Sequence, residues 1–421
     1  MRRVVVTGLG CVSPFGVGRH VFWQKLKDGQ SGITALRAFD CSKFPSKIAG
    51  SVPRQGQFGF NPSSYSYIDE RMMAPFIQFA MVAATEAVAS AGFVEHDFRT
   101  DEGLRQRTGV SIASGIGGIG EIVANSDILA NQRYGRISPY FIPKMLINLA
   151  AGHVAIRYGL EGPCHAVSTA CASAANSIGD SYNFIRLGMA DIMICGGTEA
   201  ATEPVSFAGF CRAQALSTKY NDEPEKASRP FDKNRDGFVM SEGAGILVLE
   251  EYERAKARGA EILAEIKGYA ATCDAHHITK PNGPSSYRCM ADALRQASIS
   301  SGSVDYVNAH ATSTPAGDAV EARNLEKLFA NESRTAKPLV SSLKGALGHM
   351  LGASGGAESV ACVLSLSTDL VPPTLNLVDL DPVVNLPFAT QEARHRPLRN
   401  ILKNSFGFGG VNVSLVFGKP E

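Results

Sequence analysis

The sequence lacks several features that mark whole classes of proteins. Lys and Arg number 41 against 40 Asp and Glu, so the net charge is only +1 and the basic excess of a nucleic-acid binder is missing. No run of about 18 apolar residues occurs, so no membrane span is predicted. Low-complexity tracts and a repeat of about 20–50 residues are absent, which excludes a solenoid.

Cysteine is present but follows no framework pattern. The nine cysteines are an odd number and include no CxxC pair, which argues against a disulfide scaffold and a zinc ribbon. We therefore expect a reducing compartment and mostly buried thiols. The N-terminus runs from Arg2 and Arg3 straight into Val4, without the apolar region of a secretory signal.

What the chain does have is a large apolar share, 44%, and 42 glycines in 421 residues. Short apolar segments alternate with segments of helical spacing, which predicts an α/β fold with a buried, largely parallel sheet. A charged helical stretch over 250–261 ends one such series, and a second series begins after it, so we place a boundary near residue 260. Residues 34–72 are polar and predict a surface excursion. The predicted strands cover 4–7, 108–113, 190–195, 244–249, 265–270, 304–309 and 411–417, and the predicted helices 74–91, 174–187 and 288–296.

Three motifs resemble binding sites only in spelling. GIGGIG at 115–120 fits a dinucleotide loop, but no acidic residue follows about 20 residues later, which favours a packed or flexible loop. DKNRDG at 232–237 begins like a calcium loop, yet its twelfth position is Gly243, so a turn tied by its own carboxylates is expected. The Cys, Asp and two His of 273–277 match no standard zinc spacing.

Two segments combine a reactive side chain with the end of a short strand. In HAVSTACASAA (165–175), Cys171 lies where a strand meets a helix of small residues, and a helix N-terminus favours a thiolate and lowers the pKa of the thiol. In VDYVNAHATSTPAGD (304–318), an apolar strand leads to His310 and two threonines, at the kind of strand end where ligands gather. Taken alone, each fits a packed structural residue equally well.

Two further segments are rich in glycine. VSSLKGALGHMLGASGG (340–356) surrounds His349 with five glycines and places Lys344 five residues earlier, without the spacing of a phosphate loop. NSFGFGGVN (404–412) sets two aromatics among three glycines, which suits a movable loop that offers backbone N–H groups to an oxyanion. A packed turn is the alternative in both cases. Together the four segments supply the groups for acyl transfer through a thioester.

In this order and spacing, the four segments resemble the β-ketoacyl-[acyl-carrier-protein] synthases of the thiolase superfamily, in the elongating form with a Cys-His-His triad. VVVTGLG (4–10), SRPFD (228–232) and DGFVMSEGAG (236–245) are similar to family stretches too, so the resemblance covers nearly the whole chain. It implies a five-layered αβαβα fold of two similar halves, which we place at residues 1–260 and 261–421. It also implies decarboxylative condensation of malonyl-ACP with a cysteine-bound acyl chain, which lengthens fatty acids by two carbons.

The resemblance also implies roles for individual residues. Cys171 would be the nucleophile, His310 and His349 the pair that promotes decarboxylation, Lys344 their supporting lysine, and Phe408 both a gate and an oxyanion donor. The remaining implied positions are Ile116 and Phe210 in the acyl pocket, Thr312 and Thr314 on the pantetheine, Asp318 and Glu321 behind the histidines, and Asn308, Glu358 and Asn412 at a structural monovalent cation.

The implied partners are acyl-ACP and malonyl-ACP, with a homodimer as the assembly and no resident cofactor, because the phosphopantetheine arrives on the carrier. Exposed Arg and Lys would receive the acidic carrier; the candidates are Arg71, Arg133, Arg136, Arg212 and Lys219. The location implied is the cytoplasm of a bacterium or the mitochondrial or plastid matrix of a eukaryote. Ala311, where many bacterial members have Gly, tilts the origin toward an organelle.

Related enzymes fit less well. A thiolase would need a second cysteine near 406–410, and a type III synthase would have Asn in place of His349. An inactive partner subunit of a heterodimeric synthase would lack the nucleophile, which is present as Cys171. A polyketide or other specialised ketosynthase stays open.

Overall fold

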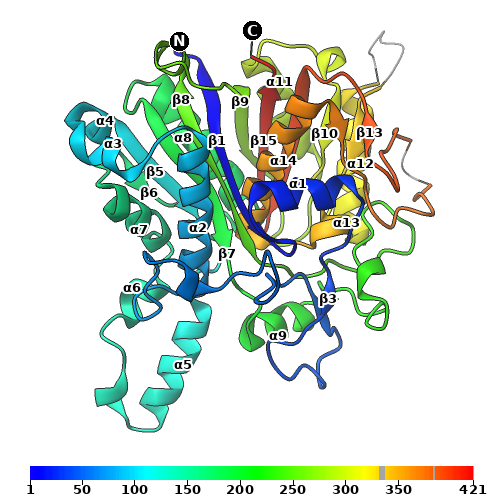
Figure 1. Cartoon of the computed structure of the whole chain (residues 1–421). Helices are drawn as coiled ribbons and strands as arrows, with labels where there is room; N and C mark the ends of the chain where they lie inside the picture. The colour runs from blue at the N-terminus through cyan, green and yellow to red at the C-terminus, as the bar shows by residue number, and fades with distance from the viewer. Residues whose placement is uncertain (331–336, 383–384, 421) are drawn as a thin grey trace.

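The computed structural model describes residues 1–330, 337–382 and 385–420 (Figure 1). The strands of its main sheet are β1 (Val4–Ser13), β2 (Gly16–Val17), β5 (Thr108–Ala113), β6 (Cys164–His165), β7 (Ile192–Glu199), β8 (Gly243–Glu251), β9 (Ala264–Cys273), β10 (Tyr306–Asn308), β11 (Leu339–Ser341), β14 (Asn400–Gly407) and β15 (Val411–Gly418). They lie in the order β11-β10-β14-β15-β9-β1-β8-β7-β5-β6, with β2 paired to β1. Two small ribbons, β3 (Thr34–Ala35) with β4 (Ile48–Ala49) and β12 (Leu370–Val371) with β13 (Arg394–His395), lie outside this sheet.

The helices are α1 (Arg19–Lys27), α2 (Pro75–Ser90), α3 (Glu95–Thr100), α4 (Glu102–Arg107), α5 (Ile119–Ala130), α6 (Phe141–Met145), α7 (Leu149–Tyr158), α8 (Ser173–Arg186), α9 (Pro204–Arg212), α10 (Tyr252–Ala257), α11 (Pro284–Gln296), α12 (Pro315–Leu328), α13 (Lys344–Leu347) and α14 (Ser354–Thr368). Short 3₁₀ turns precede two of them: η3 (Ala170–Ala172) leads into α8, and η6 (Leu351–Ala353) leads into α14.

The strand order is the same topology used twice. In the first half the order is β1-β8-β7-β5-β6, and in the second half it is β9-β15-β14-β10-β11, with the same strand directions at each step. The halves join where Val5 pairs with Glu265 and Val6 with Ala264. This duplication is the architecture that the predicted halves require, although the division into domains at residue 260 stays a prediction.

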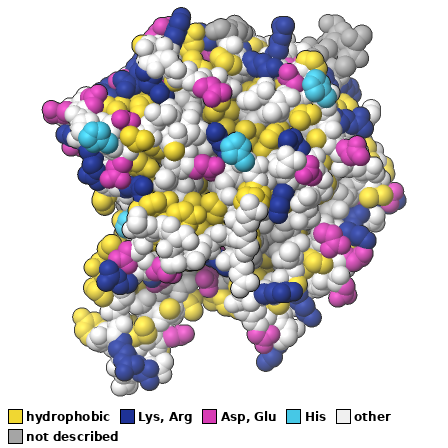
Figure 2. Space-filling view, in the orientation of Figure 1, with side chains coloured by type: hydrophobic (Ala, Val, Ile, Leu, Met, Phe, Trp, Pro, Cys, Tyr) yellow, Lys and Arg dark blue, Asp and Glu magenta, His cyan; other side chains and the backbone are white. Residues whose placement is uncertain are grey.

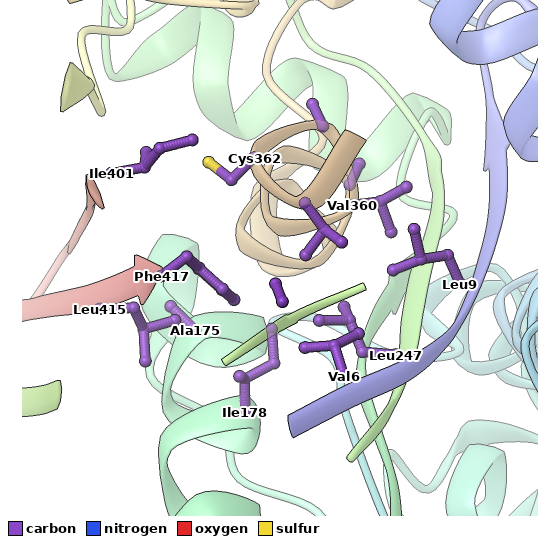
Figure 3. Close-up of a cluster of buried hydrophobic side chains, with 14 of the residues drawn as sticks. Val6, Leu9, Ala175, Ile178, Leu247, Val360, Cys362, Ile401, Leu415 and Phe417 are labelled. Atoms are coloured by element: carbon purple, nitrogen blue, oxygen red, sulfur yellow. The ribbon is translucent and has the colours of Figure 1, made fainter. Parts of the chain in front are cut away.

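Two helices lie between the halves of the sheet. Helix α8 contacts β5 and β7 on one side and β9 and β15 on the other, and α14 contacts both β8 and β14. Figure 3 shows this layer: Val360 and Cys362 on α14 face strands of different halves, and Ile178 on α8 lies below them. Helices α2 and α7 cover the outer face of the first half, and α11, with α12 against it, covers the second. The predicted five-layered αβαβα fold is therefore confirmed.

The prediction of a largely parallel sheet is wrong. Strands β5, β6 and β7 are parallel, as are β10, β11 and β14, but β1–β8, β7–β8, β9–β15 and β14–β15 are antiparallel. The physical reason is the connections: β14 returns as β15 through a tight glycine turn, and a hairpin needs no crossover helix. An apolar strand is buried equally well in a parallel and in an antiparallel sheet, so the hydrophobic pattern of the sequence could not indicate the strand directions.

Strand β1 is also longer than the predicted 4–7, because Gly8 and Gly10 lie inside it. A Cβ at Gly10 would lie 1.9 Å from the carbonyl oxygen of Ala83, and one at Gly8 would lie 2.1 Å from that of Ala87. The two glycines therefore let α2 pack directly on the strand. The other predicted strands and helices are confirmed, with ends that differ by a few residues. The exception is the helix predicted over 250–261, of which the structure forms only the shorter helix α10.

The surface is mixed in charge, and one arm projects from it. Figure 2 shows acidic and basic side chains interspersed on the visible face. Figure 1 shows α5 and α6 extending away from the sheet at the lower left, and residues 34–72, between α1 and α2, form the predicted excursion. No helix in the described part of the chain is both long and apolar enough to cross a membrane.

Candidate active site

A cavity of about 690 Å³ brings the four chemistry-bearing segments together. It lies where the ends of strands from both halves meet, which is why residues far apart in sequence share it. The predicted site residues that line it are Ile116, Cys171, Phe210, His310, Thr312, Thr314, Asp318, Glu321, His349, Phe408 and Asn412.

The Cys171 turn is held in a strained conformation. Ala170, just before the cysteine, has a backbone φ of 50°, which residues other than glycine rarely adopt. The Ser173 hydroxyl fixes the turn: it accepts the Thr169 N–H at 2.8 Å and donates to the Ala170 carbonyl at 2.6 Å. Cys171 thus lies at the entry to α8 with part of its surface open to the cavity.

Two backbone N–H groups, of Cys171 itself and of Phe408, face the cysteine sulphur and stabilise its thiolate form. The loop after β14 reaches this close because residue 407 is glycine: a Cβ there would lie 2.5 Å from the Thr169 oxygen. The pair of donors is the arrangement that an oxyanion requires. Phe408, predicted as the gate, is 41% exposed, and Gly409 and Gly410 follow it with positive φ.

The expected lowering of the Cys171 pKa is wrong. Burial raises the pKa of the thiol to about 12, and the buried Glu199 carboxylate also raises it. Lys344 and the two backbone N–H groups act in the opposite direction without overcoming burial. At neutral pH the resting cysteine is therefore a thiol, and the helix N-terminus does not ionise it.

His310 and His349 lie next to each other on the cavity wall. Their ring centroids are 5.6 Å apart, at 84° between the planes, and Phe406 and Phe238 flank them edge-on. Burial and the charge of Lys344 lower the pKa of both imidazoles well below the usual range, so both are neutral at pH 7. His349 Nδ1 is 2.9 Å from the Ser354 hydroxyl; when that hydroxyl donates, the ring proton stands on Nε2.

Of the two carboxyls predicted behind the histidines, Glu321 bonds to the backbone of His310, whereas Asp318 bonds to other segments. Glu321 accepts the backbone N–H groups of His310 at 2.9 Å and Ala311 at 2.7 Å, which fixes the end of β10. Asp318 accepts the Phe231 N–H at 2.9 Å, and burial raises the pKa of its carboxyl to about 7. Thr312 and Thr314 lie on the cavity side, with their hydroxyl oxygens 3.0 Å apart.

Two family models cover most of the chain. The model of the beta-ketoacyl synthase N-terminal domain matches residues 1–255, and that of the C-terminal domain matches residues 263–378. This chain is a β-ketoacyl synthase. It therefore belongs to the acyltransferases, and the thioester chemistry indicated by the four segments is the chemistry of its family.

Full-length relatives agree with this family. The 3-oxoacyl-[acyl-carrier-protein] synthase 2 of Rhizobium meliloti is 47% identical, over 99% of this chain and 98% of its own. The mitochondrial 3-oxoacyl-[acyl-carrier-protein] synthase of Arabidopsis thaliana is 45% identical, over 99% and 93%. Among solved structures, a type II polyketide ketosynthase in complex with its acyl-carrier protein superposes with a TM-score of 0.87 at 33% identity, over both whole chains.

The cation that the resemblance implies does not fit this β-ketoacyl synthase. Lys344 contacts one oxygen of Glu358, and the Lys403 Nζ is 3.1 Å from the other, so two ammonium groups already occupy the carboxylate. The Asn412 amide donates to Asp274 at 2.8 Å, and that of Asn308 donates to the Tyr306 hydroxyl at 3.0 Å. Since both Glu358 oxygens lie beside ammonium groups, the residues at this position fit an internal ammonium better than a metal ion.

Sequence reasoning missed Glu199, which lies at the end of β7 with no exposed surface. Its carboxylate accepts the Ser114 hydroxyl at 2.7 Å and the N–H groups of Gly115 at 2.8 Å and Gly352 at 3.0 Å, and it also reaches the N–H of Ile116. Glu199 thus ties the GIGGIG loop, with its pocket residue Ile116, to the turn after His349. The sequence signal that could have revealed Glu199 is an acidic residue at the end of an apolar strand.

The other two motifs that resembled binding sites, at 232–237 and 273–277, do not form metal sites in the described residues. Asp232 of the DKNRDG turn accepts the N–H groups of Asn234 and Asp379, as the turn interpretation predicted. No cluster of metal-ligating side chains occurs in the described ranges, and Asp274 and His277 instead line the cavity. The loop that carries them meets the loop after β14, where the Gly409 N–H donates to the Ile278 carbonyl at 2.7 Å.

Proposed function

We propose that this chain is a self-sufficient elongating 3-oxoacyl-[acyl-carrier-protein] synthase, in which Cys171, His310 and His349 carry out the chemistry. The observation that carries the proposal is the shared cavity: one cysteine under two backbone N–H donors, beside two neutral imidazoles. The full-length relatives bear the same enzyme name, which supports this reaction.

In the first half-reaction, Cys171 attacks the carbonyl carbon of an acyl thioester on the carrier protein. The N–H groups of Cys171 and Phe408 hold the oxyanion, an effect worth about 3–4 kcal/mol per donor. The cysteine proton leaves with the carrier's phosphopantetheine sulphur, which departs as a thiol. Because the thiol rests protonated, this transfer accompanies the attack.

In the second half-reaction, a malonyl thioester loses CO₂, and the electron pair of the broken C–C bond becomes an enolate. The Nε2–H groups of His310 and His349 donate to the enolate oxygen, which requires both rings to be neutral. The enolate carbon then attacks the acyl-cysteine, and the Cys171 thiolate leaves and takes a proton from solvent water in the cavity. The product is a 3-oxoacyl thioester two carbons longer, and the residues named supply every step without a resident cofactor.

The finer partner assignments belong to this proposal as well. The acidic carrier protein would dock on exposed basic side chains around the cavity, and a carrier–ketosynthase complex among the structural relatives supports such docking. All five predicted positions are exposed: Arg71, Arg133, Arg136, Arg212 and Lys219. Arg71 also pairs with Asp69 at 2.6 Å, which makes it the weakest of the set.

A homodimer would use the side of the molecule that carries β6. This two-residue strand is the edge of the main sheet, α7 packs beside it, and the segment from α5 to residue 189 carries many exposed apolar side chains. The exposed apolar side chains between the start of α5 and residue 189 are Ile122, Val123, Leu129, Tyr134, Tyr140, Ile142, Leu146, Ile156, Leu187 and Met189. The compartment proposed is that of the carrier protein, either a bacterial cytoplasm or a mitochondrial or plastid matrix.

Intact-mass measurement tests the proposed function. Purified chain is mixed with acyl-ACP thioesters of graded length, as wild type and as Cys171→Ala, and malonyl-ACP is then added. We expect an acyl adduct on the wild type only, followed by a product longer by two carbons. An adduct at another residue, or no adduct with any thioester, would refute the assignment of Cys171. Acylation by the wild type without elongation would favour a specialised ketosynthase or a partner subunit.

A further inference from the structure

A second buried lysine stands beside the triad, and the expected reaction does not use it. Lys403 lies in the middle of β14 with no exposed surface. Its Nζ is 3.1 Å from Glu358 and 3.0 Å from the Asn404 carbonyl, and it also contacts the Ser405 hydroxyl. The ammonium group therefore donates hydrogen bonds to the Asn404 carbonyl and the Ser405 hydroxyl and forms an ion pair with Glu358.

Asn308 lies next to this group. It is the register partner of Lys403 in the parallel pair β10–β14, so the two side chains share a face of the sheet. The Asn308 Oδ1 is buried, and no partner for it occurs in the described part of the chain. The surroundings of Lys403 thus combine carboxylate, carbonyl, hydroxyl and amide oxygens.

Charge neutralisation alone does not explain Lys403. Glu358 is 2% exposed and already pairs with Lys344, so two buried ammonium groups share this one carboxylate. Burying an unbalanced charge is costly unless fixed dipoles surround it. Both ammonium groups also act electrostatically on His310 and His349.

We propose that the Lys403 ammonium is a built-in replacement for the monovalent cation that the family resemblance implies, and that it positions Glu358 and, through Glu358, Lys344 beside the histidine pair. Lys403 is thus a positioning residue, since it touches neither the cavity nor the reacting atoms. The consequence is that this chain needs no added K⁺ or Na⁺, whereas removal of the ammonium creates a cation-binding space with the same oxygens.

The test compares wild type, Lys403→Ser and Lys403→Met in choline chloride, KCl and NH₄Cl at equal ionic strength. We expect equal wild-type turnover in all three salts. In choline, Lys403→Ser should lose about tenfold or more in kcat for malonyl-ACP decarboxylation, with KM unchanged, because a fixed charge near the transition state is lost. K⁺ or NH₄⁺ should restore most of that loss. Lys403→Met should be equally slow in every salt, because its side chain fills the space.

A matched control is Lys419→Ser, since Lys419 pairs with Asp369 on the surface and should change nothing. Wild-type dependence on K⁺, or full activity of Lys403→Ser in choline, would overturn the proposal. The activity readout depends on the proposed function, so thermal unfolding is measured in the same salts: K⁺ should raise the melting temperature of Lys403→Ser but not that of wild type. This shift in melting temperature tests the cation replacement without any catalytic assay. If the wild type made no 3-oxoacyl product, that result would contradict only the proposed function.

Discussion

Among single residues, Cys171 shows most clearly how burial and local charge compete. Its side chain lines a cavity inside the protein, where a thiolate loses much of the solvation of bulk water, and burial raises the pKa of the thiol to about 12. Lys344 offsets part of this effect, and Glu199 adds to it. At neutral pH the nucleophile is consequently a thiol, the form that reacts slowly with oxidants and alkylating agents.

This pKa predicts how alkylation of Cys171 depends on pH. Only the thiolate reacts with iodoacetamide, and its fraction rises about tenfold per pH unit below the pKa. We expect the rate at Cys171, followed by peptide mass mapping, to rise steadily between about pH 6 and 9. Lys344→Met should react more slowly at each pH, because it removes a positive charge that lowers the pKa.

The reference for that measurement is Cys273 of the same protein, an exposed cysteine mapped in the same digest. A rate at Cys171 that reached a plateau below about pH 8 would contradict the prediction. It would mean that the helix N-terminus, and not burial, determines the pKa of the nucleophile.

Among the elements, the contact between β1 and α2 depends on two glycines. The backbone of α2 approaches β1 so closely that the Ala83 and Ala87 oxygens lie where side chains at Gly10 and Gly8 would be. This contact anchors the outer layer of the first half to the strand that joins the two halves.

Gly10→Ala should therefore destabilise the protein, since its Cβ would lie 1.9 Å from a backbone oxygen that cannot rotate away. We expect a loss of about 1–3 kcal/mol in the free energy of unfolding, measured by urea denaturation. Gly209→Ala in α9 is the matched control, because nothing lies within 4 Å of its Cβ position. That change should be neutral or stabilising by about 0.5–1 kcal/mol. Equal effects at both positions would contradict the close approach.

For the whole molecule, the duplicated topology explains why one cavity holds the complete site. The entry to α8 supplies Cys171, and the corresponding entry to α14 follows His349 in the other half. The two turns even share their strain: Leu351 has a φ of 47°, close to that of Ala170. Helices α8 and α14 pack on each other in the central layer, so their N-terminal turns lie together.

The proposed dimer makes a prediction at this same scale. Light scattering should give wild type a mass about twice 44.7 kDa. Ile156→Glu on α7, whose side chain is 70% exposed on the β6 side, should shift the mass toward one chain, because a buried unpaired charge opposes association. Val378→Glu, equally exposed elsewhere, should stay dimeric. A monomeric wild type, or a dimer unaffected by Ile156→Glu, would contradict this interface.

The sequence by itself determined which groups are available and in which order. Cys171, His310, Lys344, His349 and the glycine loop are local patterns, and short-range rules of strand ends and helix starts were enough to single them out. Helices such as α2, α8 and α11 were likewise readable from apolar spacing within one segment.

Tertiary structure alone decided what depends on contacts between distant segments. One example is the antiparallel direction of β7–β8 and β14–β15. Two others are the burial that keeps Cys171 protonated and the hydrogen bonds by which the Glu199 carboxylate joins two glycine-containing turns. Lys403 is the clearest case, because in sequence it is one lysine in an apolar strand. Only the packing of α14 on β14 gives it Glu358 as a partner, and desolvation, which makes that pair matter, is a property of the folded interior.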